Sequence, residues 1–316
     1  MKKSNDKKLM PITPAFIGAI EPSSDDLTFT HSVFSQCFFP LRKLKNNAKS
    51  YTSKHGKASL FVKAGEIADP DNEGHFIELD VPHGAAADLS MSHINNHIIR
   101  AGSIDEACEV NMGDNMRAFF ERYNLPVCGS SARQVRTQVM NIAHATMRLG
   151  VWSDSQVKQL NFPCIAEEID FWVEKDSRQY TLWQPRMLVN RKYVEAIRER
   201  GVPHDMRALI GLYETPRALQ VYKWLAYRLP LIRDESGVFV PFYGENGLHS
   251  VFGRGLDKYR FKQTFLEDTL PEALKWYQTA TLSIDDKRNG LRLYNSPSPV
   301  PKELLEKKSL FFPKGR

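Results

Sequence analysis

The fold signal is strongest in residues 253–277, which read GRGLDKYRFKQTFLEDTLPEALKWY. Asp257 is a residue type that commonly precedes the first turn of a helix, because its carboxylate accepts hydrogen bonds from the free N–H groups there. Phe261 and Phe265 follow at helical spacing and should face a core. Pro271 predicts a break or a kink, because proline has no N–H to donate within a helix. These residues predict a helix that begins after Asp257 and buries one face.

The neighbouring segments place this helix in a definite order of elements. Residues 215–229, TPRALQVYKWLAYRL, predict an amphipathic helix, residues 237–240 a strand and residues 245–253 a short helix. Towards the C-terminus, TLSID and LRLYN flank DKRNG (286–290), in which Asn289-Gly290 predicts a tight hairpin turn. Helix, strand, helix, helix and a hairpin with a basic tip is the order of a winged helix.

The first half of the sequence begins with signals for a hairpin and two helices. Two β-rich runs, 59–67 and 74–82, are separated by a turn-rich segment and predict a hairpin. A helix is predicted over about 86–101, and Gly102 is a typical residue to end it. Asp114 is expected to cap a short helix that follows.

A third helix of this half is predicted to begin at Ser130 or Ser131 and to bury an apolar stripe. The stripe consists of Val135, Val139, Ile142 and Met147. Strands are expected near 148–153, 156–162, 165–174 and 180–189, and another helix over about 190–200. The order of elements therefore occurs twice, at about 86–190 and 205–295. We predict an α+β protein with two tandem winged-helix domains.

Composition changes suggest where the domains end. Residues 1–25 mix Lys, Pro, Ser and Asp and predict a flexible basic arm. Gly201 and Pro203 predict a domain boundary, so an N-terminal domain is expected over 26–200 and a C-terminal domain over 201–296. Residues 297–316 form a Pro- and Lys-rich tail.

Composition excludes several classes of protein. The 316 residues are 42% hydrophobic and 25% charged, which is typical of a globular protein rather than a disordered one. No run of about 18 apolar residues is present, and the basic, polar N-terminus does not look like a secretory signal. The four cysteines form no CxxC pair and fit free thiols. We expect a bacterial cytoplasmic protein, associated with nucleoid or plasmid DNA and not with a membrane.

The net charge of +6 is distributed unevenly along the sequence, with an acidic block between basic ones. Residues 1–54 carry nine Lys/Arg against four Asp/Glu, a net charge of +5, whereas residues 55–130 carry five against twelve, a net charge of −7. Residues 131–200 and 201–316 carry net charges of +3 and +5. Such segregation can turn a positive surface towards a polyanion and leave another surface for protein contacts; a mosaic of solvated surfaces is the alternative.

DNA-binding candidates gather in the C-terminal domain, at the start of the predicted recognition helix and on the predicted wing. In a helix-turn-helix, long cationic and amide side chains there meet base edges and phosphates. The helix candidates are Arg254, Lys258, Arg260, Lys262 and Gln263, and the wing candidates are Lys287, Arg288 and Arg292. The alternative is that the basic side chains of the helix only form a solvated face. The basic hairpin tip beside the helix argues against that alternative.

The N-terminal domain has a comparable but weaker set of DNA-binding candidates. They are Ser131, Arg133, Gln134, Arg136, Thr137 and Gln138. An ordinary capped amphipathic helix explains the same residues equally well. The hairpin that follows, from residue 151, has no Arg–Lys tip. This domain should therefore bind DNA less electrostatically than the C-terminal domain.

Signals for enzymatic chemistry are weak. His93 and His97 have the i, i+4 spacing of a zinc site on a helix, but the Glu of a metalloprotease and a third ligand are missing. The GRG at 253–255 lacks the other residues of a phosphate-binding loop. No nucleophile and base stand out as a pair. We expect a non-enzymatic protein with no cofactor and no metal.

The C-terminal half resembles plasmid-encoded RepA-type replication initiators. The residues that carry the resemblance are Val202, Pro203 and Asp205, followed by Val221, Tyr222, Trp224, Leu225, Tyr227, Arg228 and Leu229. VFGRGLDKYRFKQTF and LRLYNSPSPVP continue it, and KASLFVKAG, LDVPHGAAADL, INNHIIRAGS and GDNMRAFFERYNL extend it upstream. In all it covers about residues 30 to 301. His204 stands where the family usually has an aliphatic residue.

The resemblance implies a tandem winged-helix initiator that binds repeated double-stranded sites, called iterons, at a plasmid origin. It also implies a homodimer formed through the N-terminal half, recruitment of host replication proteins such as a helicase or an initiator, and repression of the protein's own gene. Two alternatives stay open: a transcriptional repressor that never initiates replication, and a DNA nickase. Nicking of a supercoiled plasmid would distinguish the nickase, because an iteron binder leaves the topology of DNA unchanged.

Overall fold

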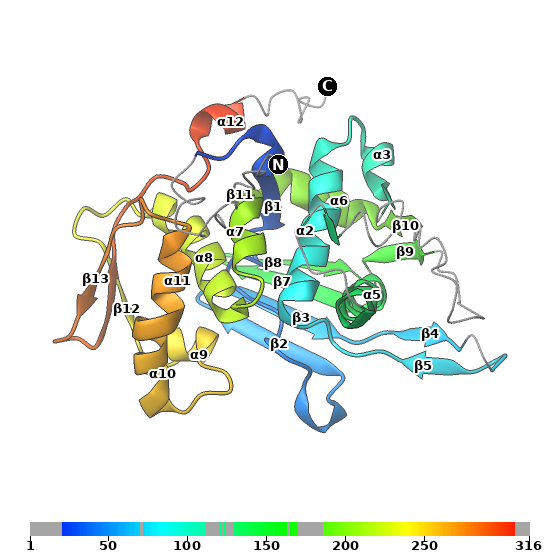
Figure 1. The fold of residues 1–316 in the computed structure, drawn as a ribbon, viewed down its shortest axis with the longest axis horizontal. Coiled ribbons are helices and arrows are strands. Elements are labelled where there is room, and N and C mark those ends of the chain that lie inside the picture. The colour runs from blue at the N-terminus through cyan, green and yellow to red at the C-terminus, as the bar shows by residue number, and fades with distance from the viewer. Residues whose placement is uncertain are drawn as a thin grey trace, which may run out of the picture.

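A computed structural model describes residues 21–69, 72–111, 120–121, 123, 129–153, 155–162, 165–169 and 186–306. Below, residues 21–200 are the N-terminal half and residues 201–306 the C-terminal half. Helices and strands are mixed in both halves, as Figure 1 shows. The fold is therefore a mixed α/β fold.

Two paired strands join the start of the described chain to its middle. β1 (Leu27–His31) pairs antiparallel with β11 (Gly201–Asp205), and Phe29 lies opposite Pro203. All five residues of β1 are buried. Pro203 is tolerated because this sheet has only two strands and β11 needs few ladder hydrogen bonds. The predicted boundary at Gly201 and Pro203 thus falls within a paired strand and not in an open linker.

The main sheet of the N-terminal half has four antiparallel strands in the order β2-β3-β7-β8. Their bounds are β2 (Ser50–His55), β3 (Ala58–Lys63), β7 (Thr146–Trp152) and β8 (Val157–Phe162). Leu60 and Val62 of β3 and Met147 and Leu149 of β7 alternate into the core. The strands predicted near 148–153 and 156–162 are confirmed. Met147 was predicted to lie in the preceding helix, which is wrong, because that helix ends at His144.

The hairpin predicted from 59–67 and 74–82 is only partly correct. The first run divides at Gly65, which lies against the His144 carbonyl and leaves no room for a Cβ. Its first part is β3, which pairs with β2 and β7. Its second part, β4 (Glu66–Ala68), pairs with β5 (Phe76–Glu78). The alternating pattern identified the strands but not the partner of β3.

The remaining elements of the N-terminal half are helices and a three-stranded sheet. They are η1 (Ser24–Asp26), η2 (Lys45–Asn47), α2 (Gly84–Arg100), α3 (Ile104–Cys108), β6 (Glu109–Asn111), α5 (Gly129–His144), β9 (Ala166–Ile169), β10 (Arg186–Val189) and α6 (Arg191–Arg200), with sheet order β6-β10-β9. The helices predicted over 86–101 and 190–200 are confirmed. The first ends at Arg100, and its C-cap is Ala101 rather than the predicted Gly102. α5 already begins at Gly129, so Ser130 and Ser131 lie inside it, and the helix predicted after Asp114 falls largely outside the described residues.

The C-terminal half has the predicted order of elements. They are α7 (Met206–Gly211), α8 (Pro216–Arg228), η3 (Leu229–Leu231), β12 (Val238–Pro241), α9 (Leu248–Phe252), α10 (Lys258–Thr264), η4 (Phe265–Thr269), α11 (Leu270–Lys275), β13 (Leu282–Asp285), β14 (Gly290–Leu293) and α12 (Lys302–Glu306). β12 pairs with β14, the return strand of the hairpin. Near Pro271 the helix widens into the π turn η4 and continues as α11, so the predicted irregularity is a π bulge.

The N-terminal half is less regular than predicted. Its hairpin β7–β8 pairs with β3, a strand that precedes α2. In the C-terminal half the corresponding partner, β12, follows α8. The order at about 86–190 is therefore not a simple copy of the order at 205–295.

The two halves share one hydrophobic core and several polar contacts. The Lys223 ammonium of α8 lies 2.6 Å from the Asp88 carboxylate of α2, and both side chains are buried. The Gln220 amide donates to the Phe39 carbonyl at 3.0 Å. These contacts place α8 of the C-terminal half against α2 (Figure 1).

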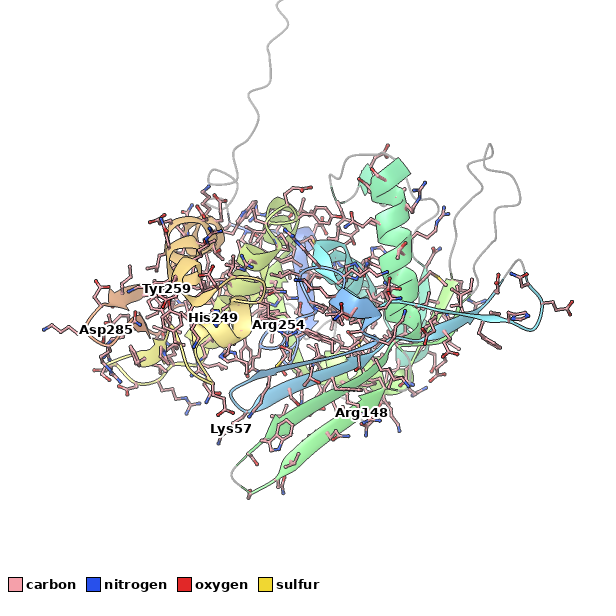
Figure 2. The ribbon with its side chains drawn as sticks, turned by 90° about the horizontal axis from the view of Figure 1, so that it is seen from below. Lys57, Arg148, His249, Arg254, Tyr259 and Asp285 are labelled. Carbon is pink, nitrogen blue, oxygen red and sulfur yellow. The ribbon has the colours of Figure 1, made fainter. Side chains whose placement is uncertain are left out.

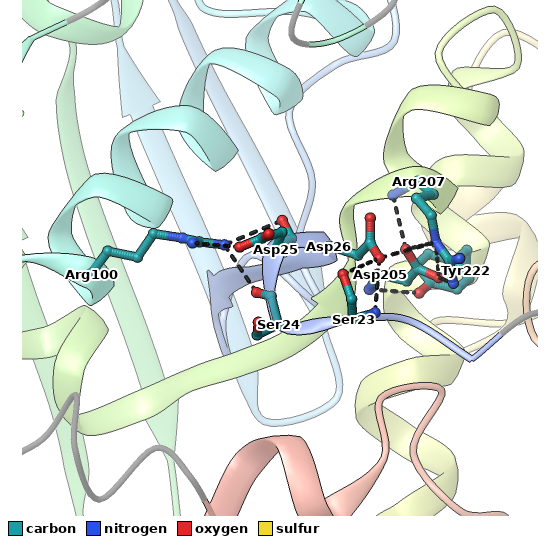
Figure 3. A network of polar contacts seen from close by, with 8 residues as sticks. All are labelled: Ser23, Ser24, Asp25, Asp26, Arg100, Asp205, Arg207 and Tyr222. Carbon is teal, nitrogen blue, oxygen red and sulfur yellow. Dashed lines mark hydrogen bonds and ion pairs between the residues drawn. The ribbon is translucent and has the colours of Figure 1, made fainter.

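Residues Ser23–Asp26 are held on both sides, as Figure 3 shows. Arg100 donates to the Ser24 carbonyl at 3.0 Å. On the other side, Arg207 forms an ion pair with Asp205 at 2.7 Å and a longer one with Asp26 at 4.0 Å. The last residues of the predicted flexible arm, 23–25, are therefore held in place, and residues 1–20 lie outside the described part of the chain.

The tail after residue 296 is partly helical. Val300 is buried, and α12 follows it. Residues 307–316 lie outside the described part of the chain. Among the described helices, none combines the length and apolar character that crossing a bilayer requires.

Candidate nucleic-acid interface

Helix α10 begins at a well-defined cap. The Asp257 carboxylate accepts hydrogen bonds from the N–H groups of Tyr259 at 3.0 Å and Arg260 at 2.9 Å. The bond from Arg260 is the main cause that holds the pKa of Asp257 below its usual value. The turn before the cap contains Gly255 at φ +83°, a conformation that favours glycine. The start of α10 is therefore fixed by local chemistry, as the sequence predicts.

Aromatic packing orients α10. Phe261 and Phe265 are buried with ring centroids 5.3 Å apart. Phe261 also contacts the His249 ring of α9 edge-on at 5.1 Å, and Phe265 contacts Phe252 at 6.0 Å. One face of α10 is thus locked against α9. The opposite face is left to solvent.

The exposed face presents cationic, amide and aromatic side chains. Lys258, Arg260 and Gln263 are exposed, as predicted for residues that contact DNA. Tyr259 is 94% exposed, although it is a large aromatic residue (Figure 2). Tyr259 was not among the residues predicted from the sequence. Its position two residues before the buried Phe261 is the signal that could have placed it on the outer face.

The tip of the hairpin β13–β14 is tied to α10. The Lys262 ammonium donates to the Asn289 side chain at 3.0 Å and lies 3.7 Å from the Asp286 carboxylate. Arg288 stacks on the Phe239 ring, 3.9 Å from its centroid. Lys287 is exposed at the tip. The structure therefore brings the predicted helix residues and the predicted wing residues into one surface.

Two of the predicted arginines bind other parts of the chain instead. The Arg292 guanidinium donates to the Ser236 carbonyl at 3.0 Å and to the Asp285 carboxylate at 3.3 Å. The Arg254 guanidinium donates to the Thr52 carbonyl at 2.9 Å and lies 4.3 Å from the centre of the Tyr51 ring. Arg292 thus braces the hairpin. Arg254 joins the start of α10 to strand β2 of the N-terminal half.

The candidates in the N-terminal half lie on the first turns of α5. Four of them, Arg133, Gln134, Arg136 and Thr137, are exposed, and Ser131 is half-buried. Gln138 does not belong to this surface. It is 2% exposed, and its amide oxygen accepts the His83 N–H at 2.9 Å. Helical periodicity could have indicated this, because Gln138 lies three residues after the buried Val135.

The histidines considered as metal ligands have other partners. The His93 ring lies 2.6 Å from the Tyr123 hydroxyl, whereas the His97 ring lies 3.2 Å from the Glu106 carbonyl. Over the part of the chain that the structure describes, no three His, Cys, Asp or Glu side chains gather as metal ligands would. Cys37 and Cys108 are buried free thiols, and the other two cysteines are outside the described residues.

Comparison with known proteins identifies the family. The family described as plasmid-encoded RepA protein matches residues 81–240, half of the chain. The chain belongs to this family. Its membership supports a role in the initiation of plasmid replication. In this RepA-family chain the matched segment runs from just before α2 into β12, so α10 and the hairpin β13–β14 lie beyond it.

Two solved structures are similar to this RepA-family chain, both of domains 2 and 3 of RctB. The selenomethionine derivative is 9% identical with a TM-score of 0.45, and the match covers 75% of this chain and 82% of the other. The structure titled RctB domains 2-3, RctB-155-483, is 10% identical with a TM-score of 0.47, and the match covers 82% and 94%. No curated protein matches the chain.

Proposed function

We propose that the protein is a replication initiator that binds repeated double-stranded sites at a plasmid origin. The observation that carries this proposal is the joint surface of α10 and the hairpin tip. Lys258, Tyr259 and Arg260 project from a capped helix start, and Lys287 and Arg288 stand beside them on the hairpin. A helix start with such side chains suits the major groove, and a basic hairpin suits the neighbouring backbone.

The order of elements in the C-terminal half supports a winged helix. α9 and α10 are the helix pair, and the sheet β12-β14-β13 supplies the hairpin. In the N-terminal half, Arg133, Gln134 and Arg136 of α5 would be a second and weaker DNA contact. The acidic block over residues 55–130 repels phosphate and leaves that half suited to protein contacts. We therefore include homodimer formation through this half, recruitment of a host helicase or initiator, and repression of its own gene.

The proposal is of a non-enzymatic protein. The surface of α10 and the hairpin offers cations, an amide and a phenol but no paired nucleophile and base. Incubation of the protein with supercoiled plasmid and magnesium or manganese should leave the plasmid supercoiled. Nicked circles would replace the proposal with the nickase alternative.

The test of DNA recognition compares two exposed cations. Arg260→Ala should weaken binding to origin DNA by about 5- to 150-fold, because loss of a base contact costs about 1–3 kcal/mol. Lys192→Ala, on the exposed side of α6, should not change it. Footprinting of wild-type protein on the DNA that flanks its gene should reveal direct repeats. Unchanged affinity of the Arg260→Ala variant for origin DNA would show that α10 is not part of the interface. A single protected site without repeats would favour the repressor alternative.

A further inference from the structure

The outer face of the sheet β2-β3-β7-β8 is an open surface that the duplex interface does not use. The inner face packs Leu60, Val62, Met147 and Leu149 into the core. On the outer face, β7 and β8 present mostly exposed residues to solvent, and none of the described helices crosses them in Figure 2. An antiparallel sheet commonly leaves one face solvated, but the composition of this face is unusual.

The four strands contain no Asp or Glu, although they lie in a half with a strongly acidic block. Their exposed cations include Lys54, Lys63 and Arg148. Lys54 pairs with Glu245 of the C-terminal half at 3.1 Å. The exposed Lys158 of β8 lies opposite Val151, on the other face, so Lys63 and Arg148 are the cations that these strands leave on the open area. Strands that carry cations and no carboxylates of their own attract a polyanion.

Aromatic rings lie among these cations. The six-membered ring of Trp152 covers Gly150, where an added Cβ would lie 2.6 Å from it, and Trp152 is 43% exposed. One step along the same face, the Arg148 guanidinium lies 5.4 Å from the centre of the Phe61 ring. Gly150 and Arg148 are residues i and i+2 of β7, about 6.6 Å apart, so the Trp152 ring over Gly150 lies next to the Arg148–Phe61 pair.

The open face adjoins the proposed duplex interface. In Figure 2, Arg148 is labelled on the sheet, and Arg254, Lys57 and Tyr259 are labelled to its left, with Tyr259 the farthest of them. The hydrogen bond from Arg254 to the Thr52 carbonyl joins β2 to the turn before α10. A strand separated from a duplex bound at α10 could therefore reach the sheet without leaving the protein.

We propose that this open face binds single-stranded DNA, with bases stacked on Trp152 and on the Arg148–Phe61 pair and phosphates near Lys63 and Arg148. The inference rests on the proposed role in origin binding and extends it to the opened strand. Single-stranded DNA is the occupant that fits, because its bases are free to stack on exposed rings, whereas the bases of a duplex are covered by their neighbours. A four-stranded sheet face is also wider than the two-stranded ribbon that the major groove of a duplex admits.

The test measures fluorescence anisotropy of a labelled poly-dT of about 20 nucleotides, longer than a typical single-strand site, with the full-length protein. Trp152→Ala should weaken this binding by about 5- to 150-fold, the effect of removing one stacked base. Trp152→Tyr, which keeps a ring, should restore most of it. Phe76→Ala, which removes an exposed ring from the β4–β5 hairpin, is the matched control and should bind as wild type.

A charge variant gives a second measurement. Lys63→Glu should weaken poly-dT binding and reduce its salt dependence, whereas Lys192→Glu on α6 should do neither. The same Trp152 and Lys63 variants should keep wild-type affinity for duplex origin DNA, and Arg260→Ala should keep wild-type affinity for poly-dT. That separation distinguishes failure of this inference from failure of the proposed duplex interface. Equal poly-dT affinity for wild type and Trp152→Ala would overturn the inference.

Discussion

At the scale of single residues, the pair Lys223–Asp88 is the most deeply buried ion pair between the described halves. Their side chains are 3% and 7% exposed, and Nζ lies 2.6 Å from Oδ1. The Lys223 ammonium also lies 5.9 Å from the centre of the Phe38 ring. Removing one partner leaves the other charge buried and uncompensated, which is costly even where the intact pair contributes little.

Asp88→Ala should therefore lower the free energy of unfolding by about 3–5 kcal/mol. The double variant Asp88→Leu, Lys223→Met should recover much of that stability, because no buried charge is left. Urea unfolding of the two variants and the wild type measures both effects. A decrease below about 1 kcal/mol for Asp88→Ala, the size expected of an exposed pair, would show that water reaches this site.

Single residues also show where prediction from sequence stops. The Asp257 cap could be predicted because its hydrogen bonds are to N–H groups two and three residues away. Arg254 could not be placed, since its partner Thr52 is 202 residues away. The burial of Gln138 follows from helical periodicity, but its partner His83, 55 residues away, could not be predicted. A long polar side chain is equally compatible with DNA and with a distant carbonyl until the fold has brought that carbonyl near.

At the scale of elements, the hairpin β13–β14 has a stiff base and an exposed tip. Arg292 ties its return strand to Ser236, and Lys262 ties its turn to α10. Asn289 adopts φ +53°, the left-handed conformation that the predicted Asn-Gly turn requires. The tip is therefore held in one position beside α10 while Lys287 remains exposed.

Replacing Lys287 and Arg288 together by Ala should weaken binding to origin DNA and to random duplex alike. The steepness of log K against log salt should fall by about 0.9 for each phosphate that the tip no longer neutralises. Affinity measured over a series of salt concentrations tests this, with Lys192→Ala as the control on α6. A slope identical to that of the wild type would show that the hairpin tip does not contact DNA phosphates.

Elements with local signals were predicted well, and pairings between distant strands were not. α2, α8 and α10 were predicted from the spacing of their apolar residues, and α10 also from its Asp257 cap. The pairing of β1 with β11 sets Phe29 opposite Pro203 and Thr30 opposite Val202, and these partners share no local stretch of sequence. Such pairings depend on which faces are left to bury once the helices are in place, and a local window of sequence does not contain that information.

At the scale of the whole molecule, the two halves are joined too closely to act as independent domains. β1 pairs with β11 across the predicted boundary, and one hydrophobic core includes residues of both halves. The ring of His55, in β2, lies 5.8 Å from that of Trp224, in α8. The proposed DNA contacts at α10 and the proposed protein contacts in the N-terminal half would therefore belong to one folded unit.

Three buried or half-buried histidines lie at this junction, and burial is the main cause that lowers the pKa of each. The pKa falls from 6.5 to about 4 for His31 and His55 and to about 3 for His204. Arg200, Arg228 and Lys223, respectively, lower these values further. Between pH 6.5 and these lowered values, the unfolded chain binds more protons than the folded one.

The stability that these histidines contribute should accordingly be complete above about pH 6.5 and decrease as the pH falls towards 4, because protonation then favours the unfolded chain. The slope approaches about 1.4 kcal/mol per pH unit for each histidine. Urea midpoints at about pH 7.5, 6.5 and 5.5 measure it. His55→Phe, which keeps an aromatic ring against Trp224, should show a shallower decrease over the lower part of this range than the wild type. Equal midpoints at the two ends of the range in the wild type would mean that water reaches all three rings in the folded protein.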